Sequence, residues 1–328
     1  MRVARFYSPE RIEIREETPP SIKEGEILLR VEACGVCGTD LFKLRSGAEG
    51  KVLGHEISGV VEELKGVEGL KAGDRVFVAH HVPCFVCSHC RRGNYSLCSL
   101  FHKTNIYPGG FAELIRVPSP NVEKALIKIE DDLSFETATL IEPLACAWRN
   151  IKRMSPHPGD EILIVGGGPA GLMHLHLLES MGLYHVDVLE IREERKRWAQ
   201  NFGARKVISP GDRSSYDIVV ICAGNLEAVR EGMERVRKGG KVSIFAQLPP
   251  GNSYPLDPNL IYFGTNLMGT YSSTPIEQRE IYDMMKIGRL EADKFISHIF
   301  PLSRIQEAFS LALKGEDSCK IIIKPQEP

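Results

Sequence analysis

The feature that most constrains the fold is a repeated order of apolar runs and glycine-marked turns in the second half of the chain. Residues 161–167, EILIVGG, are almost continuously apolar, as in strands buried on both faces of a parallel sheet. Similar runs follow at 185–191, 205–209, 216–224 and 240–246, with helical spacing between the first three and before the last. This alternation predicts an α/β domain with a doubly wound parallel sheet, and NLMGTYSS at 266–273 is the expected sixth strand.

The first turn of this domain carries a phosphate-binding pattern. Gly166, Gly168 and Gly171, with Ala170 between the last two, follow the spacing G-x-G-x-x-G. Such glycines allow a tight turn, close approach of the backbone to a pyrophosphate and close helix–strand packing, and the helix N-terminus favours the negative charge. The alternative is a glycine turn that binds no nucleotide. The apolar strand before the turn and the apolar helix after it favour a dinucleotide site.

The end of the second strand bears on which dinucleotide is bound. Glu190 follows Gly171 by nineteen residues, where a carboxylate accepts hydrogen bonds from the ribose hydroxyls of NAD and repels the 2′-phosphate of NADP. Arg192, Arg195, Lys196 and Arg197 follow at once and could instead hold that phosphate. The sequence favours NAD over NADP, with Arg195 expected along the adenosine.

Residues 1–145 have a different sequence pattern, which is typical of β-strands. Residues 26–34 and 74–82 alternate like half-buried strands, and many glycines separate such segments, which predicts a small antiparallel barrel or sandwich. After about residue 290 the alternation of predicted strands and helices stops. An amphipathic helix and a final strand, CKIIIKP, follow and are expected to return to this first domain. The predicted boundaries are 1–145 with 290–328 for the β-rich domain, and 146–289 for the α/β domain.

Four of the nine cysteines fall within fifteen residues, at Cys84, Cys87, Cys90 and Cys98. Because the chain is expected to be cytoplasmic, where thiols stay reduced, a disulfide framework is disfavoured. Zinc takes four tetrahedral ligands, and a site of four thiolates leaves no position for substrate. The spacing therefore predicts a structural zinc site that staples a loop, with a tight turn at Gly93 and Asn94. His80, His81 and His89 are nearby competitors, but four thiolates complete the shell.

Composition excludes several classes of function. The formal net charge of -2, without a basic stripe, argues against nucleic-acid binding. The N-terminal residues lack the apolar core of a signal peptide, and no run is long enough for a membrane span. The chain is therefore expected to be a cytoplasmic globular protein with no membrane partner.

A second candidate site combines residues that have ordinary explanations singly. Cys37 could be a small buried residue and His55 a satisfied core histidine, with Glu56 following directly. Glu142 lies in a mostly apolar predicted helix at 133–154, where an unpaired carboxylate is costly and a metal would account for it. Because the chain also contains a predicted nucleotide-binding domain, these residues together suggest a catalytic metal site.

The chain resembles the zinc-dependent medium-chain dehydrogenases, the superfamily of alcohol, polyol and threonine dehydrogenases. The resemblance covers essentially the full length and rests on CGTD, GHE, the four-cysteine lobe, EPLA and GGGPAG, in that order. It implies a GroES-like β-barrel catalytic domain followed by a Rossmann domain. GHE together with EPLA resembles the sorbitol and threonine dehydrogenase branch, in which the third zinc ligand is a carboxylate.

The resemblance also implies roles for individual residues. Cys37, His55 and Glu56 correspond to catalytic zinc ligands, and Glu142 to a glutamate that ligates the metal directly or through its water. Thr39 resembles the hydroxyl that relays the alcohol proton. Many relatives place a histidine three residues later, but this chain has Phe42, which cannot pass a proton to solvent. The proton exit path and the substrate therefore remain open, and Phe42 could line the substrate pocket.

The resulting expectation is an oxidoreductase with two zinc ions per chain that transfers hydride between a secondary alcohol, of polyol or sugar-alcohol type, and NAD. A threonine-type amino-alcohol dehydrogenase is the main alternative. A zinc-free quinone or enoyl reductase would not need Cys37, His55 and Glu56. The distant alternative is a non-catalytic nucleotide-binding zinc protein. The expected partners are a small-molecule alcohol and further copies of the chain, as a dimer or tetramer.

Overall fold

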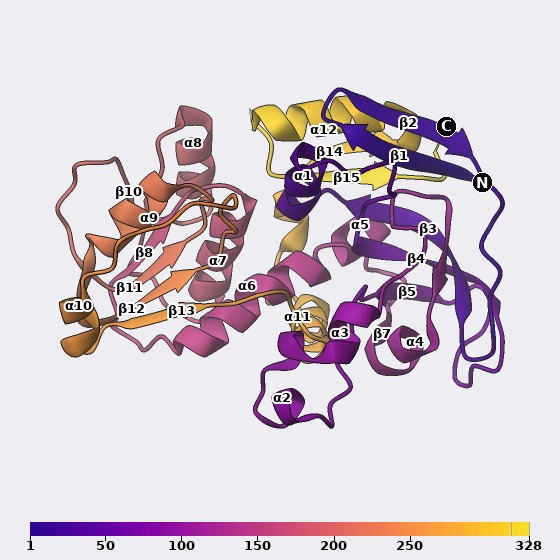
Figure 1. Cartoon of the computed structure of the whole chain (residues 1–328), viewed down its shortest axis with the longest axis horizontal. Coiled ribbons are helices and arrows are strands. Elements are labelled where there is room, and N and C mark those ends of the chain that lie inside the picture. Colours follow the sequence, from indigo (N-terminus) through magenta and orange to yellow (C-terminus); the bar gives the residue numbers. More distant parts are fainter. Residues whose placement is uncertain (316, 328) are drawn as a thin grey trace. The chain divides into compact units, whose positions relative to one another are not determined.

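The computed structural model describes residues 1–315 and 317–327 (Figure 1). The chain divides into two compact units, residues 1–143 with 274–328 and residues 144–273. Helix α6 (Ile141–Met154) contains the first boundary. Among the described residues, no helix is long and apolar enough to cross a membrane.

The second unit is built on a six-stranded sheet in which every neighbouring pair is parallel. The strand order is β10-β9-β8-β11-β12-β13, the doubly wound order of dinucleotide-binding domains. The strands are β8 (Ile162–Val165), β9 (Val186–Leu189), β10 (Lys206–Ile208), β11 (Tyr216–Ile221), β12 (Val236–Ile244) and β13 (Asn266–Gly269). All four residues of β8 are buried, because helices cover both faces of such a sheet. The structure confirms the predicted doubly wound fold, including its sixth strand.

Helices occupy the connections that the sequence indicated. They are α7 (Pro169–Ser180), α8 (Glu193–Asn201), α9 (Leu226–Met233) and α10 (Pro258–Tyr262). Helix α7 begins after Gly168 with Pro169 in its first turn, where the missing proline N–H costs nothing. The Asn225 side chain accepts a hydrogen bond from Ala228 N–H and so caps α9.

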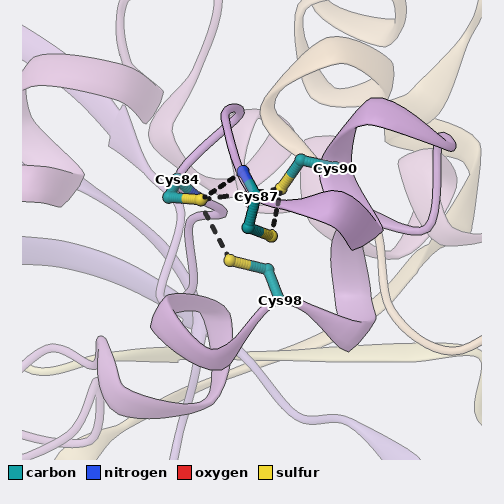
Figure 2. A group of neighbouring side chains, drawn as sticks. All are labelled: Cys84, Cys87, Cys90 and Cys98. Atoms are coloured by element: carbon teal, nitrogen blue, oxygen red, sulfur yellow. Dashed lines mark hydrogen bonds between the residues drawn. The ribbon is translucent and has the colours of Figure 1, made fainter.

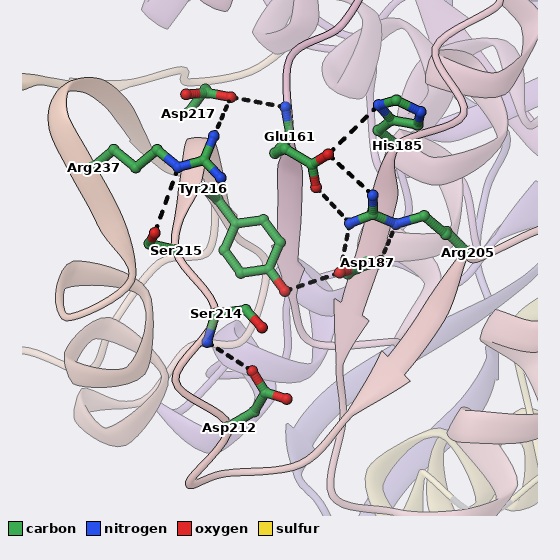
Figure 3. Close-up of polar contacts among 10 residues, drawn as sticks. All are labelled: Glu161, His185, Asp187, Arg205, Asp212, Ser214, Ser215, Tyr216, Asp217 and Arg237. Atoms are coloured by element: carbon green, nitrogen blue, oxygen red, sulfur yellow. Dashed lines mark hydrogen bonds and ion pairs between the residues drawn. The ribbon is translucent and has the colours of Figure 1, made fainter.

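A polar network ties together the amino ends of four strands of this sheet (Figure 3). Arg205, just before β10, donates to both carboxylate oxygens of Asp187 on β9, at 2.8 and 2.9 Å, and is also paired with Glu161 before β8. The Tyr216 hydroxyl at the start of β11 donates to Asp187 at 2.9 Å. Because Asp187 is only 2% exposed, these bonds satisfy a carboxylate that would be costly to bury alone. The network lies at the opposite ends of the strands from the glycine turn, so its role is structural.

The first unit contains a seven-stranded sheet and a separate antiparallel pair, β1 and β2. The large sheet has the order β14-β15-β3-β4-β5-β7, and β6 also pairs with β3. The strands are β1 (Arg2–Ser8), β2 (Arg11–Glu16), β3 (Ile27–Gly35), β4 (Glu56–Leu64), β5 (Arg75–Val78), β6 (Leu114–Val117), β7 (Leu126–Lys128), β14 (Ile296–Pro301) and β15 (Lys320–Lys324). The predicted return of the chain end is confirmed, since β15 pairs antiparallel with β3.

Short helices connect these strands. They are α1 (Gly38–Arg45), α2 (Ser88–Arg91), α3 (Ser99–Lys103), α4 (Ser119–Ala125), α5 (Phe135–Ala138), α11 (Pro275–Lys286), α12 (Ile305–Lys314) and the 3₁₀ turns η1 (Tyr95–Leu97), η2 (Ala292–Phe295) and η3 (Leu302–Arg304). Helix α12 is the expected amphipathic helix and ends at Gly315 in the left-handed conformation, φ 64°. The predicted helix at 133–154 is instead divided into α5 and α6. Ser134 caps α5 as expected, through a hydrogen bond from Thr137 N–H.

The chain returns to the first compact unit at Thr274, whereas the predicted limit of the α/β domain is residue 289. Helix α11 is amphipathic and follows a strand, so its sequence pattern is that of a further α/β helix. Its packing differs, since its buried residues belong to the first unit and Lys286 is ion-paired with Glu130 at 2.5 Å. Periodicity predicts a helix but not the unit into which the helix packs.

Candidate active site and metal centres

The cluster that contains Cys37 is built at one end of the β3–β4 pair. In the antiparallel register Gly35 on β3 lies opposite Glu56 on β4. Cys37 follows β3 by two residues and His55 directly precedes β4, so the pairing brings the two side chains to the same edge. The ligand atoms of Cys37, His55 and Glu56 all lie within 4.8 Å of one another. The structure thus brings together three of the residues predicted to hold the catalytic zinc.

Cys37 is held by the start of helix α1. The Thr39 N–H group donates to the Cys37 Sγ atom at 3.5 Å, and the Asp40 carboxylate accepts from the Cys37 N–H group at 3.2 Å. This reciprocal capping box fixes the thiol at a helix N-terminus. The sulfur of Cys37 is thus held in place by the backbone at the start of α1.

Asp40 is a functional residue that the sequence reasoning missed. Its side chain is fully buried, and its Oδ1 atom lies 3.4 Å from His55 Nδ1. The same oxygen accepts a hydrogen bond from Gly54 N–H at 3.4 Å. Burial raises the pKa of Asp40, but the interactions with His55 outweigh this effect, so the pKa lies below its usual value. Because the carboxylate faces Nδ1, the Nε2 atom of His55 is left for a metal, as in carboxylate–histidine–zinc arrangements.

Lys320 is the second missed residue, on the first position of β15. Its buried ammonium group donates to Glu56 Oε2 and, at 2.8 Å, to the carbonyl oxygen of Val36. Burial lowers the pKa of Lys320, but Glu56 and other nearby acids raise it above its usual value, so the ammonium stays charged. A lysine opening an otherwise apolar strand, KIIIK, is the sequence signal that could have identified it.

The two oxygen atoms of the Glu56 carboxylate differ in whether they have a hydrogen-bond partner. The Oε2 atom is held by Lys320, whereas Oε1 is buried without a hydrogen-bond partner among the described residues. Gly35 allows this position, because a Cβ atom there would lie only 2.0 Å from Glu56 Oε2. A buried carboxylate oxygen without a partner is costly. Glu56 lies in one group with a thiol and an imidazole, so its unpartnered oxygen is consistent with a metal ligand.

Glu142 does not belong to this three-residue group. It lies in the first turn of α6 with 3% of its surface exposed. Its negative charge is one of those that raise the pKa of Lys320, after Glu56 and Cys37. The structure thus buries Glu142, and its direct ligation of a metal stays a prediction.

The four cysteines of the predicted structural site converge on a single point (Figure 2). Their sulfur atoms all lie within 4.8 Å of one another, with Cys90 Sγ 3.9 Å from Cys84 Sγ and 3.5 Å from Cys87 Sγ. Four sulfurs around zinc at about 2.3 Å would be separated by about 3.8 Å. The observed spacing therefore fits a tetrahedral thiolate site.

The loop backbone prepares these thiols for a metal. The N–H groups of Val86 and Cys87 donate to Cys84 Sγ and lower the pKa of Cys84. Gly93 adopts φ 75°, and its N–H group bonds to the Cys90 carbonyl, which is the expected tight turn. The neighbouring His80 and His81 do not join this group. Instead, the His80 ring packs 4.8 Å from the His55 ring.

The glycine turn of the second unit has the predicted geometry. Gly166 adopts φ 106°, and a Cβ atom on Gly171 would lie 2.0 Å from the Gly166 carbonyl oxygen, so both positions require glycine. Gly168 and Ala170 lie at the start of α7. Glu190 at the end of β9 accepts a hydrogen bond from Gly167 N–H at 2.8 Å. A Cβ atom on Gly168 would lie 3.6 Å from Arg195 Nη1. The residues predicted to bind the cofactor therefore surround one turn.

Comparison with known proteins agrees with the fold of both units. Residues 23–131 match the alcohol dehydrogenase GroES-like domain, and residues 169–287 match the zinc-binding dehydrogenase domain. The L-threonine 3-dehydrogenase of Caldanaerobacter subterraneus is 30% identical, with 98% of each chain aligned. The sorbitol dehydrogenase of Bacillus subtilis is 28% identical, over 99% of this chain and 97% of the relative.

Solved structures show the same architecture. The 2R,3R-butanediol dehydrogenase of Bacillus subtilis superposes with a TM-score of 0.86 at 25% identity, over 99% of both chains. A zinc-binding dehydrogenase from Sinorhizobium meliloti, solved with NADP, gives a TM-score of 0.87 at 26% identity, also over 99% of both chains. The chain therefore belongs to the zinc-dependent medium-chain dehydrogenase family, with a GroES-like unit and a Rossmann unit. It is an oxidoreductase of the alcohol and polyol dehydrogenase type.

Proposed function

We propose that the protein oxidises a secondary alcohol of the polyol or sugar-alcohol type, passes the hydride to NAD and holds two zinc ions per chain. The observation that carries this proposal is the meeting of Cys37, His55 and Glu56, together with a buried Glu56 oxygen that has no hydrogen-bond partner among the described residues. Such a mixed sulfur, nitrogen and oxygen set suits zinc, and three protein ligands are typical of a catalytic site.

Cys37, His55 and Glu56 would hold the catalytic zinc. Glu142 would contribute a fourth oxygen, directly or through water. Zinc supplies Lewis-acid chemistry that lowers the pKa of a bound hydroxyl group. The chain's own residues set up the rest. Asp40 orients the His55 ring, and Lys320 positions the Glu56 carboxylate. Thr39, exposed in the first turn of α1, would accept the alcohol proton and pass it on.

The proton exit differs from that of many relatives. Phe42 occupies the position three residues after Thr39, and its ring carries no proton donor or acceptor. The proton would therefore leave Thr39 by a route that does not use residue 42.

The second zinc would be held by Cys84, Cys87, Cys90 and Cys98. The sulfur spacing and the converging backbone N–H groups support this site. Because four thiolates close the coordination shell, the role of this zinc would be to stabilise the loop. Nine cysteines without a disulfide also support a reducing, cytoplasmic location.

The threonine-type alternative is kept because of the L-threonine 3-dehydrogenase relatives, which are among the most similar proteins. Against it, both units also resemble sorbitol dehydrogenase at nearly the same identity. Only substrate oxidation separates the two alternatives.

A direct test measures zinc content together with NAD reduction. Protein prepared without chelators should contain about two zinc ions per chain, and polyols or simple secondary alcohols should reduce NAD faster than L-threonine does. Zinc near one or zero per chain would contradict the two-site proposal, whereas faster oxidation of threonine would support the alternative.

We also propose a homo-oligomer, formed through the β13 edge of the second unit. Strand β13 ends the sheet and its residues are mostly exposed, without a lysine or proline to block pairing. Leu267 on β13 is an exposed apolar side chain, and so are Ile261 and Tyr262 on α10, just before β13 in the chain. Antiparallel pairing of β13 with a second copy would cover them. Light scattering on the zinc-loaded protein should give at least twice the 36.5 kDa chain mass, and a monomer would contradict the proposal.

The choice of NAD over NADP rests on Glu190. This side chain is 5% exposed and bonded to the glycine turn, so its charge lies where a ribose 2′-substituent would be placed. We expect Glu190→Ala to weaken NAD binding about 10-fold and NADP binding much less, because the change removes a hydrogen-bond acceptor and a repulsive charge together. Titration of both cofactors measures the ratio, and equal losses would contradict this role.

A further inference from the structure

A cavity of about 520 Å³ lies within the first unit, beside helix α1. Phe42 and Lys43 of α1 line one side of it, and Lys51 and Leu53 lie on the segment that leads to His55. Asn105 and Tyr107 line another side, from the segment that precedes β6. This volume is within the range typical of small-molecule sites.

Two of the segments that line the cavity are close along the chain to the three-residue metal cluster of the same unit. On α1, residues 39, 42 and 43 are spaced i, i+3 and i+4, so Thr39 shares a helix face with Phe42 and Lys43. Phe42 lies about 7–8 Å along the helix axis from Cys37, at the usual helical rise. Leu53 precedes His55 by two residues, a separation of at most about 7 Å. A small molecule that reaches the metal cluster could therefore extend into this cavity.

The lining of the cavity is positively charged and contains no carboxylate. Arg5 is neutralised by Glu17, to which it is bonded at 2.7 Å through two nitrogens. Lys43 and Lys51, by contrast, are exposed and make no ion pair among the described residues. The Asn105 side-chain oxygen accepts from Ile106 N–H at 3.0 Å, which leaves its amide donors for another group. Two uncompensated ammonium groups and an amide donor form a lining suited to an anion.

Resting on the proposed alcohol oxidation, we propose that the substrate is a polyol phosphate, whose terminal phosphate binds Lys43 and Lys51 while its hydroxyl group reaches the metal cluster. A dianionic phosphate matches two ammonium groups, and charge-assisted hydrogen bonds to it are stronger than neutral ones. In this binding mode the polyol chain would lie between the cluster and the lysines, with Phe42 and Leu53 as apolar walls for its carbon backbone. Phe42 thus lines the pocket where many relatives carry a proton-relay histidine.

The test compares sorbitol 6-phosphate with sorbitol, and with gluconate as a carboxylate analogue, in NAD reduction by the zinc-loaded protein. We expect kcat/KM for sorbitol 6-phosphate to exceed that for sorbitol by at least about 100-fold at low salt, with a smaller ratio at high salt. Lys43→Met and Lys51→Met should each lower this ratio about 10-fold, mainly through KM. Lys23→Met removes the same charge from an exposed site outside the cavity and should leave the ratio unchanged.

Calorimetric binding of sorbitol 6-phosphate keeps the test independent of turnover. Binding that weakens in Lys43→Met and Lys51→Met but not in Lys23→Met supports the phosphate site, even if no polyol is oxidised and the proposed alcohol oxidation fails. Equal kcat/KM values for sorbitol and its phosphate, together with binding unaffected by the lysine substitutions, overturn the phosphate site and leave the alcohol oxidation standing. A preference for gluconate over sorbitol 6-phosphate overturns the choice of phosphate.

Discussion

Replacement of Cys37 by serine is expected to lower turnover by about 10³-fold or more and to remove one of two zinc ions. Zinc lowers the pKa of bound water from 15.7 to about 7, a change that corresponds to about 12 kcal/mol. Loss of only a third of that assistance would slow the reaction about 10³-fold. Because the Cys37 backbone also forms the capping box of α1, serine is chosen to retain a side-chain acceptor for Thr39 N–H.

The matched control is Cys84→Ser, a substitution of the same type in the four-cysteine lobe. It should also remove one zinc ion, but with the opposite functional profile. We expect the thermal midpoint to fall by about 5–10 °C, because the loop loses its metal staple, while turnover per folded molecule is largely kept. Zinc analysis, thermal unfolding and initial rates of both variants separate the sites. If Cys84→Ser abolishes turnover without loss of stability, the structural assignment of the lobe is wrong.

The second large effect is expected for Thr39→Val, which keeps the side-chain shape and removes the hydroxyl. Turnover should fall by about 10²–10⁴-fold, the usual range for a positioned proton transfer. The Thr39 hydroxyl makes no hydrogen bond among the described residues, and the bond from Thr39 to Cys37 uses the backbone N–H group. Valine therefore leaves the helix cap intact, and zinc content and NAD affinity should be unchanged.

Measuring turnover, zinc content and NAD affinity of Thr39→Val side by side distinguishes a chemical role from a structural one. Near-normal turnover with both other quantities intact would show that the proton leaves by another route. Phe42→His provides a complementary gain-of-function comparison, since a histidine at this position would supply the missing shuttle and raise the rate at low pH. Phe42 also lines the cavity, so the substitution could change substrate binding. The KM of the Phe42→His enzyme for a polyol is therefore measured in the same experiment.

Much of this architecture could be predicted from local patterns. Continuous apolar runs and the spacing of Gly166, Gly168 and Gly171 predicted a parallel sheet with a dinucleotide turn, because buried strands and tight turns restrict residue type at each position. The spacing of the four lobe cysteines predicted their convergence for a similar reason. Ligands a few residues apart need only a short loop to meet.

Other features depend on residues far apart in the chain. Lys320 reaches Glu56 only because β15 returns to pair with β3, and no local pattern links positions separated by 264 residues. Helix α11 has the periodicity of a Rossmann helix, yet it packs into the first unit, since periodicity describes one face of a helix and not its partner.

The same distinction applies to the candidate site. Cys37, His55 and Glu56 could be named from motifs, whereas the buried Asp40 carboxylate that orients His55, the unpartnered Glu56 oxygen and the cationic cavity required three-dimensional coordinates. Residue spacing determines which side chains a short segment brings together. Strand register and packing decide which distant charges face them, because those contacts are made by tertiary structure alone.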